Sequence, residues 1–244
     1  MEEKRLSLGE HLEELRVRLI WSALAFAIAL AACFIYQEQI LRIIVSPHLK
    51  ASGGDPLRAL DYPEKFLIYF KASLIAAFVL SGPFIIYQLW KFISAGLYSH
   101  EKKHVLFYLP FSLILFATGV LFSYLIFTPF MLKYLASYGD PSLISNNFNL
   151  TNYFNLFIML TVIMGLVFQL PLIMLFLVQI KILTPQIYWS KIKISVLLAF
   201  IIAAIITPSG DPINQTLIAV PLLLLYLIGI LLSLLYLRLT KKSD

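Results

Sequence analysis

The chain has 244 residues, of which 60% are hydrophobic and only 13% are charged, and its mean hydropathy is +0.87. A soluble domain of this size cannot bury so much apolar surface, and the apolar runs lack the alternation of barrel strands, so an all-α integral membrane protein is predicted. The net charge of +6 is typical of cations flanking spans rather than of a nucleic-acid partner, and the single cysteine, Cys33, excludes a disulfide framework.

Residues 1–18 are predicted to form a cytoplasmic amphipathic helix ahead of the first span. Ser7 and Glu10 have the spacing of a capping box, and Glu14 and Arg18 stand four residues apart in the order that favours an ion pair. An apolar stripe at helical spacing comprises Leu8, Leu12, Leu15 and Leu19. The glutamates of this segment argue against a cleaved signal peptide, so the first apolar run is expected to remain as a span.

Six apolar runs follow along the chain, and most exceed the roughly 20 residues that a spanning helix needs. They cover residues 19–36, 66–90, 105–130, 154–180, 194–206 and 216–237. The fifth run is the exception, because 194–206 reaches only about 20 Å as a helix. We therefore predict a single domain over residues 1–244 with six transmembrane helices.

Six spans place both chain ends on one side of the membrane. That side carries 13 of the 19 lysines and arginines, so the positive-inside rule predicts that the N- and C-termini are cytoplasmic. Trp21, Trp90 and Trp189 adjoin these inner charges, as an interfacial aromatic belt would.

The cytoplasmic connection at 91–104 contains the sequence HEKKH, which has the written pattern of a zinc protease. A catalytic zinc needs a third protein ligand, and the best candidate, Asp211, falls on the outer side, while Lys102 and Lys103 would repel a dication. One alternative to a binding protein, an intramembrane zinc metalloprotease, is therefore disfavoured, and no metal site is predicted. The other alternative, a small-solute secondary transporter, is weakened because the sequence has no convincing internal repeat. Glu101 either pairs with its basic neighbours or binds a cation from a partner.

Six sequence segments resemble, in order, those of the TatC family, the multispanning subunit of the twin-arginine protein translocase. They are HLEELRVRL, PEKFLIYFK, SGPFIIYQLWKFISAGLYSHEKK, FATGVLFSYLIFTPF, GLVFQLP and ITPSGDPINQTLIAVPLLLLY. The resemblance covers nearly the whole chain. It implies a core receptor subunit, not an enzyme and without a cofactor, that binds twin-arginine signal peptides of folded proteins at the cytoplasmic face and nucleates the translocation complex.

The resemblance further implies a multi-pass protein of the bacterial or archaeal cytoplasmic (inner) membrane, driven by the proton motive force. The implied partners are single-span TatA- and TatB-type subunits, other copies of the chain and the lipid bilayer.

By the same resemblance, Glu14 and Glu101 are the acids that recognise arginine. The cytoplasmic patch around them would also include Arg16, Arg18, Phe92, Leu97 and His100. A carboxylate can accept two parallel hydrogen bonds from a guanidinium, which a lysine ammonium cannot offer. Two charge-assisted bonds contribute about 3–6 kcal/mol, whereas micromolar binding needs about 8 kcal/mol. Apolar contact between the signal peptide and the spans must supply the difference.

Gln169 and Pro171 mark a polar position deep in the fourth span. Pro171 is expected to leave a backbone carbonyl near Val167 unpaired, and Gln169 can donate to it or to a partner helix. Relatives of the TatC family often have glutamate at this position and at Leu227, and glutamine cannot ionise. The resemblance therefore does not extend to a protonation role.

A last group of family positions falls on or near the outer side of the membrane. It comprises Pro47, Phe66, Lys71, Tyr124, Asp211 and Gln215, which are expected to shape an outer cap and short fifth and sixth spans. Lys71 is expected to extend to the outer surface. Asp211 either caps the final helix, with Gln215 in its first turn, or has a role toward a partner.

Overall fold

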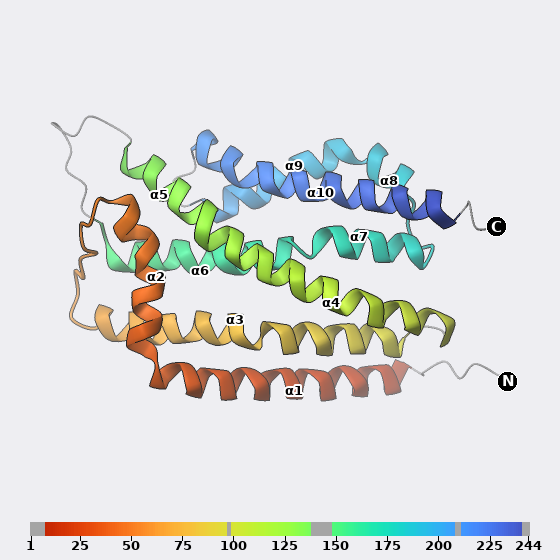
Figure 1. Ribbon diagram of the computed structural model, residues 1–244, viewed down its shortest axis with the longest axis horizontal. Coiled ribbons are helices and arrows are strands. Elements are labelled where there is room, and N and C mark those ends of the chain that lie inside the picture. The colour runs from red at the N-terminus through yellow and green to blue at the C-terminus, as the bar shows by residue number, and fades with distance from the viewer. Residues whose placement is uncertain (1–7, 97–98, 138–147, 208–210, 241–244) are drawn as a thin grey trace. The chain divides into compact units, whose positions relative to one another are not determined.

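The computed structural model describes residues 8–96, 99–137, 148–207 and 211–240, and for residues 99–107 it describes the backbone alone. These parts of the chain are helical almost throughout (Figure 1). The chain divides into two compact units, Met1–Val162 and Ile163–Asp244, named here the first and the second unit.

In the described parts of the chain, five helical segments are long and apolar enough to cross a membrane. They are Gly9–Ile35, Glu64–Ala95, Tyr108–Ala136, Leu150–Gln179 and Pro212–Thr240. A sixth apolar helix, α9 (Ile192–Ile206), has 15 residues and reaches only about 22 Å, which is short of a hydrocarbon core of about 30 Å. The predicted all-helical membrane class is confirmed by these segments, and the sixth span stays a prediction.

The first unit is built on two long helices that lie side by side, α1 (Leu8–Ile35) and α3 (Glu64–Ala95), with α2 (Gln37–Ala51) lying across one end of them (Figure 1). The chain then continues through α4 (Ser99–Phe122), the π-helical turn η1 (Ser123–Phe127) and α5 (Thr128–Ala136), and α6 (Leu150–Val167) follows. A Cβ added to Gly82 of α3 would lie 2.4 Å from the ring of Phe116 on α4. This glycine therefore lets α3 and α4 approach closely.

The core of the first unit lies where α2, α3 and α6 meet. Its buried members are Ile44, Ile68, Ala72, Ile75, Tyr153, Phe154 and Phe157. The loop before α3 is joined to the chain before α6 by backbone hydrogen bonds, from Arg58 N to the Phe148 carbonyl at 2.9 Å and from Leu150 N to the Arg58 carbonyl at 3.0 Å. The predicted loop at 37–65 is thus an ordered segment containing a 15-residue helix, α2, and is named here the outer cap after its predicted side.

The second unit packs α7 (Leu170–Gln179), α8 (Pro185–Ser190) and α9 against α10 (Pro212–Thr240). Its buried core contains Met174, Val178, Tyr188 and Ile230. A Cβ added to Gly229 of α10 would lie 2.5 Å from Met174 Sδ and 3.2 Å from Pro171 Cα. The missing side chain at 229 therefore sets how closely α7 and α10 pack.

Several boundaries differ from those expected. The predicted N-terminal helix is not separate from the first span, because α1 runs without a break from Leu8 to Ile35. The predicted fourth span is divided, since α6 ends at Val167 and α7 begins at Leu170 with Pro171 among its first residues. A proline there interrupts nothing, because the first N–H groups of a helix have no intrahelical partner.

Two further expectations about the spans were wrong. The sixth apolar run is part of α10, a helix of 29 residues, so it is not short. Trp90 does not belong to an interfacial belt, because it is only 5% exposed and its ring stacks on Tyr108 with the centroids 5.7 Å apart.

Candidate functional site

A chain of hydrogen bonds joins α1 to α3 near the N-terminal end of α1. Arg18 Nε donates to Glu14 Oε1 at 2.8 Å, and Arg18 Nη2 binds the same oxygen. Arg18 Nη1 donates to Gln88 Oε1 on α3 at 3.1 Å. The side chains of Arg18 and Glu14 are 17% and 28% exposed, and Gln88 is buried. The predicted pairing of Glu14 with Arg18 is confirmed, and Gln88 anchors that pair to a second helix.

This arrangement leaves one carboxylate oxygen of Glu14 available. Within the described residues, Glu14 Oε1 accepts both hydrogen bonds from Arg18, and no hydrogen bond is made by Oε2. Arg18 is hydrogen-bonded to both Glu14 and Gln88, so the position of the Glu14 carboxylate is fixed before a ligand binds. This lowers the entropy cost of binding. Glu14 can therefore accept an external hydrogen-bond donor without releasing Arg18.

The first turns of α1 pack on the last turns of α3 through an aromatic pair. The imidazole of His11 stacks on the ring of Phe92, with centroids 4.5 Å apart and an interplanar angle of 22°. A Cβ at Gly96 would lie 3.2 Å from the His11 ring, so the absence of a side chain there admits the imidazole. Phe92 is thus brought beside the start of α1, as the predicted patch requires, while Arg16 is exposed.

The start of α4 lies at the same end of the first unit. The stack of Trp90 on Tyr108 joins the last turns of α3 to α4, and α3 ends at Ala95 while α4 begins at Ser99. Glu101 and His100 therefore lie in the first turn of α4. Their side chains, together with all of Leu97, fall outside the described residues, so direct convergence of Glu101 with Glu14 stays a prediction.

The zinc alternative gains no support from the structure. The side chains of HEKKH lie outside the described residues. Among the side chains that are described, no group of three or more histidine, cysteine, aspartate or glutamate residues could hold a metal ion.

The residues predicted to lie on the outer side divide into bonded and exposed ones. The Tyr124 hydroxyl donates to the Ile43 carbonyl at 2.9 Å, in the helix that contains the buried Pro47. Phe66 is 73% exposed. Lys71 Nζ donates to Asn155 Oδ1 on α6 at 2.8 Å, and the expected extension of this lysine to the outer surface stays a prediction.

Asp211 and Gln215 lie at the start of α10. Asp211 Oδ1 accepts a hydrogen bond from Asn214 N at 2.8 Å, and its backbone carbonyl accepts one from Gln215 N at 3.1 Å. Of the two roles left open for Asp211, the structure contains the helix cap. Gln169 occupies the N-cap position of α7, where its carbonyl accepts from Leu172 N and Ile173 N.

Three buried polar residues were missed by sequence reasoning. Gln88 lies within an apolar run and was read as part of a span. Glu64 is 6% exposed and accepts backbone hydrogen bonds from Leu60 N at 2.5 Å, Asp61 N at 3.3 Å and Thr151 N at 2.9 Å. His48 is 2% exposed, with Nε2 3.0 Å from the Asp55 carbonyl. The available signal was a polar residue in, or directly before, an apolar helix.

Comparison with known proteins agrees with this architecture. Residues 10–221 match the family described as Sec-independent protein translocase protein (TatC). The TatC protein of Aquifex aeolicus is 38% identical over 240 residues, covering 98% of each chain. The TatCy protein of Bacillus subtilis is 35% identical over 244 residues, covering 100% of this chain and 95% of its own.

A solved structure is similar as well. The crystal structure of the twin-arginine translocase receptor TatC superposes with a TM-score of 0.84 at 38% identity, covering 93% of this chain and 99% of that one. The match in sequence extends over nearly the full length, and the match in fold includes both units. The chain therefore belongs to the TatC family of Sec-independent protein translocase proteins.

Proposed function

We propose that this chain is the receptor and core subunit of a twin-arginine translocase, which binds the twin-arginine signal peptides of folded proteins and nucleates the translocation complex. Membership of the TatC family supports a translocase component rather than an enzyme. The observation that carries the binding role is the carboxylate of Glu14, fixed by Arg18 and Gln88 with Oε2 open. The zinc-protease pattern of HEKKH is then coincidental.

Guanidinium chemistry explains how such a site selects arginine. An incoming guanidinium can donate to Glu14 Oε2 while Arg18 stays on Oε1, and Glu101, in the first turn of α4, is the proposed acceptor for the neighbouring arginine. A planar guanidinium presents paired donors in a fixed fork, whereas an ammonium presents a compact and strongly hydrated charge. The cations Arg16, Arg18 and Lys91 would disfavour a peptide that is merely basic.

The proposed topology has six spans with both termini in the cytoplasm. It is supported by the bias of lysine and arginine toward the side that holds the termini. In this topology α9 is the fifth span, and its 15 residues require the bilayer to thin locally or polar groups to enter it. Glu14, Phe92 and the start of α4 then lie at the inner leaflet of the inner membrane.

Partner subunits are needed because one six-helix chain cannot enclose a passage for a folded protein. We propose single-span TatA- and TatB-type subunits and further copies of this chain as partners, and the proton motive force as the source of energy. The place of Gln169 at the junction of α6 and α7 supports a partner contact there, since an amide side chain can bond across helices.

The experiment that tests the receptor role is site-specific photocrosslinking of a twin-arginine precursor in inverted membrane vesicles. Photoreactive residues at positions 14, 101 and 92 are expected to crosslink to the signal peptide, and the exposed position 66 on the outer cap serves as the control. A precursor whose two arginines are changed to lysine should lose the crosslinks. Crosslinks at position 66 equal to those at position 14, or none at either acid, would contradict the proposal.

A further inference from the structure

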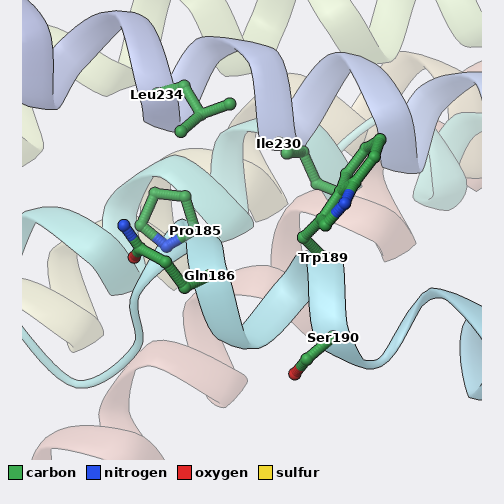
Figure 2. Close-up of a pocket in the computed structure, with 6 residues that line it drawn as sticks. All are labelled: Pro185, Gln186, Trp189, Ser190, Ile230 and Leu234. Carbon is green, nitrogen blue, oxygen red and sulfur yellow. The ribbon is translucent and has the colours of Figure 1, made fainter.

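The second unit contains a groove between α8 and α10 that no role described so far uses. It has a volume of about 420 Å³ and is lined by Pro185, Gln186, Trp189, Ser190, Ile230 and Leu234 (Figure 2). This volume is within the range of small-molecule sites. Pro185 and Ile230 are buried, whereas Trp189 is 61% exposed. The groove therefore has an apolar floor and an exposed aromatic wall.

The groove is held in shape by the tyrosine next to Trp189. The Tyr188 hydroxyl donates to the Met174 carbonyl on α7 at 3.1 Å, and the Tyr226 hydroxyl on α10 donates to the Tyr188 carbonyl at 2.7 Å. Two helices thus fix α8, and the buried Tyr188 obliges its neighbour Trp189 to face outward. In Figure 2 the Trp189 ring lies beside Ile230, while the Ser190 hydroxyl points away from α10.

Two cations, Lys191 and Arg238, lie close in sequence to the residues that line the groove. Lys191 directly follows the lining residue Ser190, so its Cα lies about 3.8 Å from that of Ser190. Arg238 is four residues beyond Leu234, which places it one turn further along the same face of α10. Between residues 163 and 240 the sequence has a single acid, Asp211, and it caps the opposite end of α10.

An apolar groove bordered by cations, on helices that meet a bilayer, matches the chemistry of one ligand class. We propose that the groove binds an anionic phospholipid, with an acyl chain between Trp189 and Leu234 and the phosphate near Lys191 and Arg238. Basic pockets beside transmembrane helices are suited to acidic headgroups, and an interfacial tryptophan suits the level of the glycerol backbone. The inference does not depend on the proposed receptor role or on the orientation of the chain.

Quenching by brominated lipids tests this site. The full chain is reconstituted in phosphatidylcholine vesicles containing a small mole fraction of phosphatidylglycerol brominated on its acyl chains, and in matched vesicles where phosphatidylcholine carries the bromine. The signal of Trp189 is the tryptophan fluorescence lost on the Trp189→Phe substitution. We expect brominated phosphatidylglycerol to quench this signal more strongly at the same mole fraction, with each cation contributing a preference of about fivefold.

Variants separate the site from general contact with lipid. Lys191→Gln with Arg238→Gln should abolish the preference, and Leu234→Phe should reduce quenching by filling the groove. Lys133→Gln, which removes an exposed cation of the first unit, should change nothing. Equal quenching by the two lipids would mean contact with bulk acyl chains only and would overturn the proposal. A preference that survives the double substitution would overturn it as well, as would a Trp189 signal that neither lipid quenches because protein covers the groove.

Discussion

Tyr124 compensates for Pro47 across the outer cap of the first unit. Proline has no backbone N–H, so Pro47 within α2 cannot donate to the carbonyl of Ile43, four residues earlier. The hydroxyl of Tyr124 donates to that carbonyl at 2.9 Å, and the hydroxyl of Tyr153 donates to the next carbonyl, that of Ile44, at 2.5 Å. The two positions, 77 residues apart in the chain, therefore act together, because Tyr124 supplies the hydrogen bond that Pro47 cannot make.

Removing the Tyr124 hydroxyl should loosen the outer cap. In Tyr124→Phe the Ile43 carbonyl loses its donor, and the free energy of unfolding is expected to fall by about 1–2 kcal/mol. The measurement is denaturant unfolding of the full chain in detergent micelles. Tyr62→Phe is the matched control, because Tyr62 is fully exposed, at 104%, and its loss should leave stability unchanged. Equal stability of the two variants would contradict the compensation.

The outer cap should weaken in mild acid through His48. Burial lowers the pKa of His48 below its ordinary value of 6.5, and the Asp55 carbonyl and carboxylate only partly oppose this shift. Because the folded state resists protonation, the unfolded state binds more protons as the pH falls below about 6.5. Stability is therefore fully present above pH 6.5 and is lost as the pH falls toward the lowered pKa.

Unfolding measured at pH 8 and pH 5 checks this expectation. In His48→Gln the amide can still donate to the Asp55 carbonyl but cannot titrate, so its loss of stability between the two pH values should be smaller than that of the wild type. The same loss in both proteins would assign the acid sensitivity to other groups.

Gly229 should not tolerate even a methyl group. In Gly229→Ala the new Cβ meets Met174 Sδ at 2.5 Å and Pro171 Cα at 3.2 Å, and such overpacking typically costs about 1–3 kcal/mol. Adding Met174→Ala should restore part of the loss, because the backbone of Pro171 remains in the way. Gly9→Ala, where nothing lies within 4 Å, is the control in the same unfolding assay and should be neutral or slightly stabilising.

Gln88 should matter for ligand affinity although the proposed ligand does not touch it. Gln88→Leu removes the acceptor of Arg18 Nη1, so Arg18 no longer fixes the Glu14 carboxylate, and affinity for a twin-arginine peptide should fall about three- to tenfold. Gln88→Glu keeps an acceptor and should retain more affinity than Gln88→Leu. Fluorescence anisotropy of a labelled peptide gives the affinities, with Gln39→Leu on the exposed part of α2 as the control.

Gln169 should act in assembly rather than in peptide binding. Gln169→Leu removes an amide at the junction of α6 and α7, so co-purification with TatA- and TatB-type subunits is expected to fall while the affinity for the twin-arginine peptide is retained. Leu170→Ala, beside it, controls for lost packing. If Gln169→Leu still co-purifies normally with the partner subunits, Gln169 has only a local structural role at the junction of α6 and α7.

The segments that cross the membrane could be read from the sequence, because a bilayer sets a minimum length and an apolar composition for any span. Hydropathy found α3, α10 and the short α9 with errors of a few residues at their ends. The pairing of Glu14 with Arg18 was equally accessible, since a spacing of four residues places both side chains on one face of a helix. For Asp211 the position before a helix left a cap as one of two possible roles, and the structure contains the cap.

Tertiary structure decided which helix faces meet. In a membrane protein the side chains that contact lipid and those that contact other helices are both apolar, so the sequence pattern carries little information about packing. Three hydrogen bonds between helices illustrate this. They join Arg18 to Gln88, Tyr124 to the Ile43 carbonyl and Lys71 to Asn155, and the bonded residues are 70, 81 and 84 positions apart in sequence. The helix propensity of each residue does not predict such contacts, because only the packing of the helices brings these groups together.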